Sequence, residues 1–518
     1  MNVGYIISRA VEQYADNICV VEGDKKITFR EVGQHINQLA NALLGLGLQK
    51  GDRVGVLMGN SWRCVEVDYG IIKGGLVRVP LNARQSPSEL ILQMTEAEAK
   101  AIIVGPEYVE QVQSMAPQMS TVTHYIATER VPSGWLNYDR FVAGAASTEP
   151  DVVVDKEDMH SFQYTSGTTG RPRAAIQDHG AWLSANLFYL AEMDTIRDSD
   201  AILHVAPMTH AAAVFMLPHF VRGARQVVLK RFDPQEVLEA IQKEKITFVV
   251  LIPTMIYMLL AYPDLRKYDH RSLKTILYAT SPMSVEKLKE AIGIFGPVFQ
   301  QGYGMTEAIP PVAHFAKEDH VVDGPPEKVK RLGSCGRPVI GVEVRLVDEE
   351  GNDVKTGEIG QIICRGGNLM KGYWKRPEDT ERALRNGWLY TRDLARVDED
   401  GFLYIVDRLD DMIISGGFNV YPREVEEALY AHPAVYEAAV VPVPDDKWGE
   451  LVKAVVVLKP GTSATEQEII DFCGTRLTGF KKPRSVDFVE ALPKSPVGKI
   501  LRRAVREKYW QGHSRLVH

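Results

Sequence analysis

The chain has few cysteines. Its 518 residues include only five, which are Cys19, Cys64, Cys335, Cys364 and Cys473. They lie far apart, and no CxxC or cysteine–histidine pair has the spacing of a zinc site. An odd, scattered set also does not predict a disulfide framework. The composition therefore indicates a reduced, intracellular protein, and we expect a cytoplasmic location.

Long hydrophobic runs and an excess of positive charge are also missing. The most apolar run, residues 247–262 (TFVVLIPTMIYMLLAY), is 16 residues long and contains Pro253, whereas a membrane-spanning helix needs about 20. It predicts a buried strand, a turn and a helix, and no transmembrane segment. Residues 1–17 lack the basic leader and apolar core of a secretory signal. The net charge of −7 argues against nucleic acid as a partner.

The patterns that are present predict an α/β protein of several domains, because 518 residues exceed a single ordinary core. Residues 26–58 predict a short strand, an amphipathic helix, a glycine-rich stop and an apolar strand. Similar alternation continues to about residue 260. Repeated β-α-β units predict parallel sheets covered by helices.

The second half of the chain has a different texture. From about Leu332 it becomes rich in strands with turn signals, and the last 110 or so residues mix helices with strands. We therefore expect a large N-terminal domain at residues 1–408, which contains β/α sheets and a small β-rich subdomain. A small α+β domain at residues 411–518 follows it.

Residues 164–173, YTSGTTGRPR, form a flexible and polar stretch. Glycines free the backbone so that its N–H groups can converge on an anion, and the hydroxyls and arginines add donors and positive charge. The stretch is not a Walker loop, because GxxxxGK[ST] does not occur in the chain. It predicts a phosphate-binding loop, with a solvent-exposed turn as the alternative.

The same stretch resembles the phosphate loop of the adenylate-forming enzymes, a superfamily that includes acyl-CoA and aryl-CoA synthetases, luciferases and peptide-synthetase adenylation domains. Further motifs follow in the order of that superfamily: APMTHAAAV, QGYGMTEA, GEIGQIICRG, the long YTRDLARVDEDGFLYIVDRLDDMIISGG segment and PKSPVGKILRR. The segments VPDDKWGE and FKKPR resemble the fatty-acid–CoA ligase branch in particular.

The resemblance implies an ATP-dependent, AMP-forming acid:CoA ligase that uses Mg²⁺ and coenzyme A. A carboxylate first attacks the α-phosphate of ATP and gives an acyl-adenylate, and the thiol of coenzyme A then forms the thioester. It also implies the nucleotide and metal residues. These are Thr165, Ser166, Gly167, Thr168, Thr169, Gly170 and Arg173 around the phosphates, Thr306 at the α-phosphate, Glu307 at Mg²⁺, Tyr303 at adenine, and Asp393 with Arg408 at the ribose.

The resemblance also implies that the large domain has two β/α sheet subdomains, that residues 409–410 form a hinge, and that the C-terminal domain is mobile. It implies that Lys499 bridges the carboxylate and the α-phosphate during adenylation. For the later half-reaction, it implies that Asp410 is the hinge residue and that Gly416 and Gly417 line the pantetheine tunnel. The positions implied for the nucleotide end of coenzyme A are Arg84, Trp448, Phe480, Lys482 and Arg484. The clustered cations of FKKPR suit the phosphates of coenzyme A, with a solvated basic turn as the alternative.

Several positions depart from the pattern of the superfamily. Arg173 replaces the usual lysine, Arg392 stands in TRD where TGD is usual, and Ala279 and Thr280 carry side chains where glycines are common. We expect Arg173 to retain ATP binding with altered mobility of the loop, and the two extra side chains to favour a short, branched or cyclic acid. His210 matches a residue that lines or gates the acyl pocket.

The substrate is therefore expected to be an apolar monocarboxylic acid that is fatty, alicyclic or aryl. Two alternatives are an acyl-AMP ligase that loads a carrier protein and a non-catalytic sensor of nucleotide or acyl-AMP. For QGYGMTEA, the alternative is a glycine-rich turn before a helix. The sequence leaves open whether the chain forms a homo-oligomer.

Overall fold

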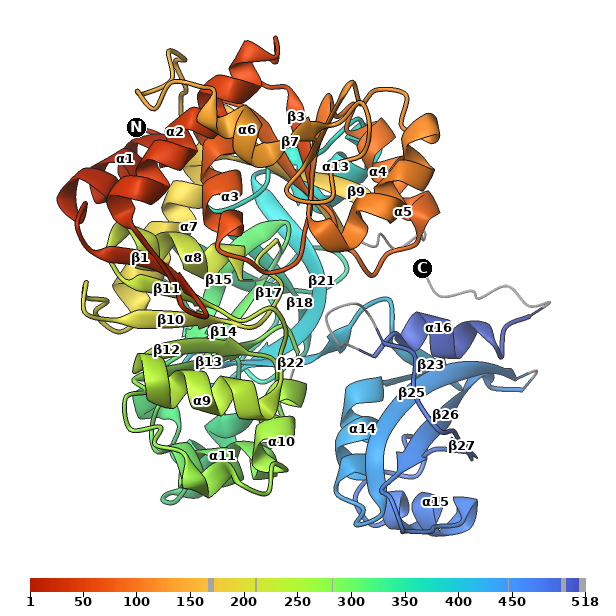
Figure 1. The fold of residues 1–518 in the computed structure, drawn as a ribbon. Helices are drawn as coiled ribbons and strands as arrows, with labels where there is room; N and C mark the ends of the chain where they lie inside the picture. The colour runs from red at the N-terminus through yellow and green to blue at the C-terminus, as the bar shows by residue number, and fades with distance from the viewer. Residues whose placement is uncertain (166–171, 210–211, 282, 446, 495–499, 512–518) are drawn as a thin grey trace. The chain divides into compact units, whose positions relative to one another are not determined.

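A computed structural model gives the fold of the chain, and it describes residues 1–165, 172–209, 212–281, 283–445, 447–494 and 500–511. The chain divides into two compact units, Met1–Glu343 with Cys364–Leu389 and Val344–Ile363 with Tyr390–His518. Figure 1 labels the helices and strands of both. The predicted hinge at residues 409–410 falls inside the second of these units and stays a prediction.

The first unit contains two large sheets. A nine-stranded sheet has the order β16-β15-β14-β13-β12-β10-β11-β1-β2, and an eight-stranded sheet has the order β19-β9-β8-β4-β3-β5-β6-β7. The nine strands are β1 (Ile18–Glu22), β2 (Lys25–Thr28), β10 (Ala201–His204), β11 (Arg225–Val228), β12 (Phe248–Leu251), β13 (Thr275–Ala279), β14 (Phe299–Met305), β15 (Ala308–Phe315) and β16 (Arg337–Pro338). The eight are β3 (Arg53–Leu57), β4 (Val77–Pro80), β5 (Ala101–Val104), β6 (His124–Ala127), β7 (Leu136–Asn137), β8 (Met159–Thr165), β9 (Arg173–Asp178) and β19 (Gly372–Tyr373).

The strands in the middle of both sheets pair in parallel, and antiparallel pairs such as β14 with β15 and β8 with β9 lie toward one end of each order. Parallel strands need crossover connections, and helices supply them. Those of the first unit are α1 (Val3–Gln13), α2 (Phe29–Gly45), α3 (Arg63–Lys73), α4 (Pro87–Glu96), α5 (Val109–Met115), α6 (Tyr138–Ala143), α7 (His179–Glu192), α8 (Ala213–Val221), α9 (Pro234–Glu244), α10 (Pro253–Leu260), α11 (Val285–Phe295), α12 (Pro326–Lys330) and α13 (Pro377–Ala383).

Local sequence signals explain where several helices begin. Thr28 and Glu31 form a capping box at the start of α2, in which each side chain accepts a hydrogen bond from the other residue's backbone N–H. The strand, helix and strand predicted for residues 26–58 are observed as β2, α2 and β3. The apolar run at 247–262 likewise forms buried strand β12 and helix α10, as predicted.

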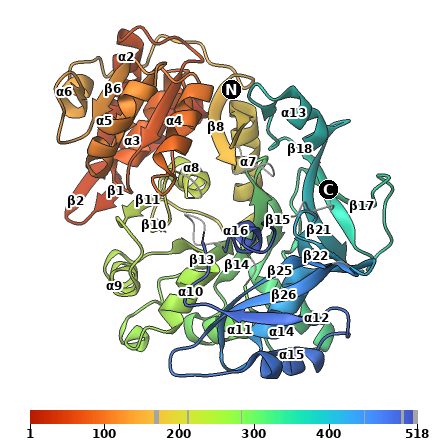
Figure 2. The same cartoon turned by 90° about the vertical axis from the view of Figure 1, so that its right-hand side faces the viewer.

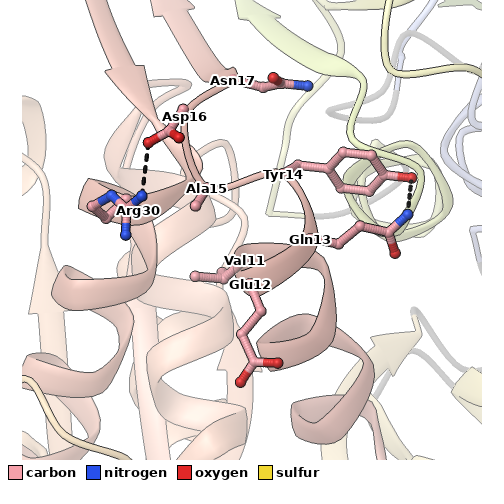
Figure 3. Close-up of a pocket in the computed structure, with 8 residues that line it drawn as sticks. All are labelled: Val11, Glu12, Gln13, Tyr14, Ala15, Asp16, Asn17 and Arg30. Atoms are coloured by element: carbon pink, nitrogen blue, oxygen red, sulfur yellow. Dashed lines mark hydrogen bonds and ion pairs between the residues drawn. The ribbon is translucent and has the colours of Figure 1, made fainter.

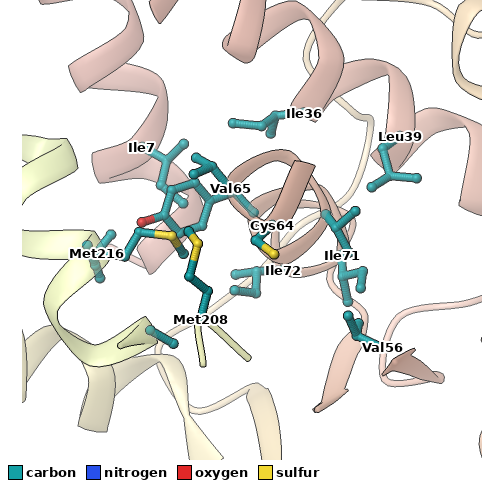
Figure 4. Packing of buried hydrophobic residues seen from close by; sticks show 14 of the residues in the cluster. Ile7, Ile36, Leu39, Val56, Cys64, Val65, Ile71, Ile72, Met208 and Met216 are labelled. Carbon is teal, nitrogen blue, oxygen red and sulfur yellow. The ribbon is translucent and has the colours of Figure 1, made fainter. Parts of the chain in front are cut away.

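Side chains of the eight-stranded sheet alternate between two cores. Val54 and Val56 of β3 pack with helices α1, α2 and α3 and with residues of α7 and α8, whereas Leu57 packs on the opposite face with α4 and α5. Figure 1 shows α1, α2 and α3 side by side near the N-terminus, and Figure 2 shows α4 and α5 against the sheet. Figure 4 shows part of the first core, including Ile36, Cys64 and Met216.

The second unit contains most of a β-rich sheet and a small α+β layer. The division between the units falls within β17, β18 and β21. The β-rich sheet has the order β17-β18-β21-β20, with β22 also paired to β21. Its strands are β17 (Val342–Val347), β18 (Gly360–Gly366), β20 (Leu384–Arg385), β21 (Trp388–Val397) and β22 (Leu403–Arg408).

The last sheet has the order β24-β23-β26-β25, with β27 paired to β26, and its apolar faces pack against helices. Its strands are β23 (Ile413–Ser415), β24 (Phe418–Val420), β25 (Val435–Asp445), β26 (Gly449–Leu458) and β27 (Ser485–Phe488). The helices are α14 (Pro422–Tyr430), α15 (Glu466–Gly474) and α16 (Arg502–Glu507). The predicted fold class, an α/β protein with several sheets and a small C-terminal domain, is confirmed.

The five cysteines are all buried and none forms a disulfide. Burial raises the pKa of the Cys64 thiol to about 12 and that of Cys473 to about 11, and it raises the pKa of Cys19 as well. These cysteines are therefore packing residues.

Candidate active site

The predicted magnesium and α-phosphate residues lie in a tight connection between two antiparallel strands. Thr306 and Glu307 join β14 to β15, so the QGYGMTEA segment forms a strand and a turn into another strand. The alternative of a turn before a helix is wrong, because residues 308–315 pair with β14 and β16 on their two sides.

Side chains and backbone groups from distant parts of the sequence fix this turn. Gln177 Nε2 donates a hydrogen bond of 2.9 Å to the carbonyl oxygen of Thr306. The Met370 N–H donates to the carbonyl of Glu307 at 2.9 Å, and Tyr373 Oη donates to Glu307 Oε1 at 2.7 Å. The Glu307 carboxylate is therefore partly buried and orientated by a neutral donor.

A single carboxylate of this kind fits Mg²⁺. Among the described residues, no three His, Cys, Asp or Glu side chains cluster as a metal cage. Mg²⁺ commonly binds through one or two carboxylates together with substrate phosphates and waters. Glu307, with one oxygen already engaged by Tyr373, provides a ligand of that type.

The two ends of the predicted phosphate loop are neighbours in the eight-stranded sheet. Thr165 ends β8 and Arg173 begins β9, and the two residues pair across the strands. Within the described residues, Thr165 Oγ1 is buried and has no hydrogen-bond partner. Of the predicted loop residues, Ser166, Gly167, Thr168, Thr169 and Gly170 lie outside the described residues.

Arg173 contacts an aromatic ring and an acid. Its guanidinium lies over the ring of Tyr373, 4.5 Å from the centroid, and Nη1 is 3.5 Å from Asp379 Oδ1. A planar guanidinium stacks on an aromatic face, which the ammonium of lysine cannot do in the same way. The same tyrosine therefore contacts both Arg173 and Glu307.

The adenine and acid candidates lie at one edge of the nine-stranded sheet. Tyr303 is buried in β14. On the neighbouring parallel strand β13, Ala279 pairs with Gly302. Thr280 follows directly with a φ of +73° and an exposed side chain. A positive φ is rare for a β-branched residue, which explains why glycine is easier to place there.

Asp393 and Arg408, the predicted ribose residues, pair across strands β21 and β22 in the second unit. Arg408 Nε donates to Asp393 Oδ1 at 3.1 Å. The Asp393 side chain is 8% exposed, whereas half of the Arg408 side chain is exposed. The pair thus combines a buried acceptor with an accessible cation.

Arg392, the departure from TGD, has a φ of +63°. This left-handed conformation is the one that glycine adopts at least cost. The Arg392 side chain forms a two-bonded ion pair with Asp410, in which Nε donates to Oδ2 at 3.0 Å and Nη2 donates to Oδ1. The extra arginine therefore binds the predicted hinge residue.

The structure also brings together four of the predicted coenzyme A positions. Gly416 and Gly417 form the turn between β23 and β24, with φ angles of +59° and +82°. The Gly416 N–H donates to the Trp448 carbonyl at 2.9 Å, and the Trp448 ring lies so close to Gly416 that a Cβ would collide with it. Phe418, which sequence reasoning missed, stacks on Phe480 at 4.8 Å.

Of the cations predicted to bind coenzyme A, Lys482 and Arg484 belong to the second unit and follow Phe480 closely in the sequence. Arg484 is exposed, and Lys482 is partly buried. Lys481 is the cation of FKKPR that already has a partner, because Nζ lies 2.8 Å from Glu424 Oε1. Arg84 belongs to the first unit and is exposed. His210 and Lys499 lie outside the described residues.

A buried polar network behind the Thr306–Glu307 turn was not predicted. Ser161 Oγ and Trp182 Nε1 both donate to Gln177 Oε1, at 3.0 Å each, while the Gln177 amide donates to Thr306. One feature of the sequence could have indicated this network. Gln177 is a polar residue at a buried position of the strand at residues 173–178 (RAAIQD), and a buried amide needs hydrogen-bond partners.

Two histidines near His210 in sequence have structural positions. His204 Nε2 lies 2.8 Å from Gln226 Oε1, and His219 Nδ1 lies 2.8 Å from the Phe215 carbonyl. Burial lowers the pKa of His204 to about 4 and that of His219 to about 3. Both are therefore neutral packing residues at pH 7.

A cavity of about 500 Å³ lies elsewhere, at the end of α1 (Figure 3). It is lined by residues 11–17 and Arg30. Two of its charged side chains pair with each other, since Arg30 Nη2 is 2.7 Å from Asp16 Oδ1. No residue of the motifs lines it, so the candidate active site is defined by the motif residues instead.

Comparison with known proteins assigns the chain. A family model described as AMP-binding enzyme matches residues 7–374, and a model described as AMP-binding enzyme C-terminal domain matches residues 424–499. The chain belongs to the AMP-binding enzyme family. Within the adenylate-forming superfamily, it is an acyl-CoA synthetase.

Three relatives of this AMP-binding enzyme illustrate the similarity. It is 39% identical to the feruloyl-CoA synthase of an Amycolatopsis species over 494 residues, which is 95% of each chain. It is 35% identical to a medium/long-chain-fatty-acid–CoA ligase of Mycobacterium tuberculosis, covering 99% of this chain and 91% of the other. A crystal structure of an anthranilate CoA ligase in complex with anthranoyl-AMP superposes with a TM-score of 0.89 at 29% identity, covering 98% and 97%.

These similarities confirm that this member of the family is an AMP-forming acid:CoA ligase. The prediction that no segment crosses the membrane was made from the apolar run at 247–262. Within the part of the chain that the structure describes, none of the helices has the length and apolar character that crossing a membrane requires.

Proposed function

We propose that this ligase activates an apolar monocarboxylic acid of short, branched or cyclic shape, using ATP and Mg²⁺, and transfers the acyl group to coenzyme A. The observation that carries the shape of the acid is Thr280, whose side chain stands at the carboxyl edge of β13. Ligands of open parallel sheets bind at that edge.

The position of Thr280 relates it to the nucleotide residues. β13 and β14 run parallel with Ala279 opposite Gly302, so Thr280 lies at the same edge from which β14 continues to Tyr303 and Thr306. A branched side chain there occupies volume that two glycines would leave open. A narrower site favours a compact acid over a long straight chain. The feruloyl-CoA synthase relative at 39% identity supports this choice, whereas the relative at 35% identity is a medium/long-chain-fatty-acid–CoA ligase.

In the proposed first half-reaction, a carboxylate oxygen attacks the α-phosphorus of ATP, the bond to pyrophosphate breaks, and the acyl-adenylate forms. We assign Thr306 to the α-phosphate, Tyr303 to adenine, and Asp393 with Arg408 to the ribose. Lys499 supplies positive charge between the carboxylate and the α-phosphate. Glu307 holds Mg²⁺, which when bound neutralises charge on the phosphates.

Arg173 and the loop residues Thr165, Ser166, Gly167, Thr168, Thr169 and Gly170 are assigned to the terminal phosphates. In the second half-reaction, the thiol of coenzyme A attacks the acyl carbon and AMP leaves. Gly416 and Gly417 keep the pantetheine path free of side chains, and the aromatic residues Trp448 and Phe480 contact coenzyme A together with Lys482, Arg484 and Arg84. Asp410 is assigned to the hinge, and His210 to the acyl pocket.

The test is an acid panel with the purified enzyme, ATP, Mg²⁺ and coenzyme A, in which AMP, pyrophosphate and thioester are all followed. Ferulate, benzoate, cyclohexanecarboxylate and hexanoate are compared with palmitate, malonate and glycine. We expect kcat/KM for the best compact acid to exceed that for palmitate about tenfold or more, as differences of several methylenes allow.

The variant Thr280→Gly should reduce this preference by raising kcat/KM for palmitate. A wild-type preference for palmitate, malonate or glycine would refute the proposed substrate class. Pyrophosphate release with the best acid but without thioester would identify an acceptor other than coenzyme A.

We also infer a cytoplasmic location. It is supported by the five buried cysteines, none of which forms a disulfide, as suits a reducing compartment. Cell fractionation with an antibody against the chain tests it, and recovery with secreted proteins would contradict it.

A further inference from the structure

Tyr373 touches two predicted phosphate-site positions that lie far apart in the sequence. Its hydroxyl donates to Glu307 Oε1 at 2.7 Å, and its ring lies under the Arg173 guanidinium at 4.5 Å. We propose that Tyr373 is a positioning residue, which sets the magnesium-binding carboxylate and couples it to the end of the phosphate loop. The inference rests on the proposed role of Glu307.

The hydroxyl restricts the carboxylate. Hydrogen bonds to an ionised acceptor are stronger than neutral ones, and Tyr373 is 6% exposed, so water competes little for this one. Glu307 Oε2 accepts no hydrogen bond from the residues that the structure describes. One oxygen is thus anchored while the other stays available to a cation, an arrangement typical of carboxylates held by an outer partner.

The backbone around Tyr373 is itself fixed. Tyr373 pairs with Ala175 of β9, two residues after Arg173, so the ring and the guanidinium belong to neighbouring strands. The Tyr373 N–H donates to Thr380 Oγ1 at 2.8 Å. Gly372 has a φ of +139°, and a Cβ there would lie 2.7 Å from Thr380 Cγ2. The tyrosine therefore has little freedom to move away from Glu307.

Arg173 completes the connection. It contacts both the Tyr373 ring and Asp379, which gives the exit of the phosphate loop a defined position next to the magnesium-binding turn. A change at either end is then transmitted through one aromatic side chain. This accounts for arginine where lysine is usual, because only the guanidinium stacks flat on the ring.

The experiment measures the dissociation constant of ATP by calorimetry, first in EDTA and then over a titration of Mg²⁺, with no acid present. Tyr373→Phe retains the ring and removes the hydroxyl. The Mg²⁺ concentration that gives half of the Mg²⁺-dependent increase in ATP affinity should be about tenfold higher for this variant than for the wild type. Loss of an outer partner of a metal ligand typically has an effect of this size. The ATP affinity in EDTA should stay unchanged.

Two variants make the result specific. Tyr404→Phe is the matched control, since it also removes a tyrosine hydroxyl that donates to a carboxylate, Asp398 Oδ2 at 2.9 Å, and it should leave the Mg²⁺ titration unchanged. Glu307→Gln is the comparator, and it should shift the titration at least as far as Tyr373→Phe.

The outcomes separate the two proposals. A shift with Glu307→Gln but none with Tyr373→Phe overturns the positioning role and leaves the role of Glu307 intact. No shift with Glu307→Gln overturns both. If Tyr373→Phe does not fold, the variant Arg173→Lys provides the test. An increase of about threefold or more in the Mg²⁺ concentration needed for half of the increase in ATP affinity supports the coupling of Arg173 to Glu307 through Tyr373, consistent with a lost cation–π contact. An unchanged Mg²⁺ concentration refutes this coupling.

Discussion

The C-terminal unit depends on one arginine that holds three acids. Arg502 Nη1 donates to Asp407 Oδ1 at 2.9 Å and to Asp411 Oδ2 at 3.2 Å, while Nε and Nη2 bind both oxygens of Glu426 at 2.8 and 2.5 Å. The Arg502 side chain is 22% exposed and that of Asp407 is 2% exposed. The substitution Arg502→Met keeps most of the apolar stem and removes the charge, so it isolates this electrostatic contribution.

Removing one partner of a buried ion pair costs about 3–5 kcal/mol. Two backbone N–H groups, of Arg408 and Arg423, also donate to Asp407, and the Val440 N–H donates to Glu426. These donors remain in the variant and compensate part of the buried negative charge. We therefore expect the lower end of the range, about 3 kcal/mol at pH 7, which corresponds to roughly 10 °C in Tm for a domain of this size.

The pH dependence has a definite sign. Burial raises the pKa of Asp407 above its ordinary value, and loss of Arg502 removes the largest of the interactions that lower it. An acid with a raised pKa binds a proton in the native state before the unfolded chain does, so lowering the pH stabilises the variant. The deficit relative to the wild type should therefore shrink between pH 7 and pH 5.

Hydrogen exchange of the β25 amides in the full-length chain measures the free energy of opening of this unit. Arg503→Met is the control, because Arg503 is half-exposed and pairs with Glu507 on the surface of α16, where a pair contributes about 0.3–0.5 kcal/mol. A deficit below about 1 kcal/mol for Arg502→Met at pH 7, or one that is equal at pH 5 and pH 7, would refute the reasoning.

Three further predictions concern other parts of the molecule. Gln177→Met leaves Trp182 Nε1 without its shorter hydrogen bond and the Thr306 carbonyl without its side-chain donor. The free energy of unfolding should therefore fall by about 1–3 kcal/mol, and pyrophosphate release should slow. An unchanged urea midpoint would contradict this prediction. Arg392→Gly relieves a left-handed backbone and removes the ion pair with Asp410, so the free energy of unfolding should change by less than about 1 kcal/mol. Thioester formation, timed separately from adenylation, should become faster. If the rates of adenylation and of thioester formation are both unchanged, the result counts against a hinge at Asp410. Burial keeps the His219 imidazole neutral in the native state, whereas in the unfolded chain it binds a proton below its ordinary pKa of about 6.5. The urea midpoint should therefore fall as the pH decreases from 7.5 to 5.5. A constant midpoint would show that the imidazole is not buried and neutral.

The sequence predicts the elements of this fold better than their long-range contacts. Helix α2 and strands β2 and β3 follow from local periodicity and a capping box, and β12 with α10 follows from one apolar run. The order of strands in the sheets does not follow in the same way, since β1 pairs with β11 about 200 residues later. Local propensity carries no information about such a pairing.

The candidate site shows the same limit. The motif residues were identified by type and spacing, but the residues that hold them were not. Tyr373 binds Glu307 across 66 positions and Arg502 binds Asp407 across 95. Arg392 was noted as a departure, yet its partner Asp410 and its positive φ are visible only in the folded strands. Such contacts depend on tertiary packing, which a single sequence does not encode as a local pattern.

The burial of all five cysteines has a consequence for an enzyme whose co-substrate is itself a thiol. Coenzyme A readily oxidises to a disulfide, and a protein thiolate that can reach this disulfide exchanges with it and becomes covalently capped. Here the thiols lie inside the packed cores, and burial raises the pKa of Cys64 and Cys473, so little thiolate forms at neutral pH. The folded ligase should therefore keep its activity in oxidised coenzyme A, and mixed disulfides should appear only when a core opens.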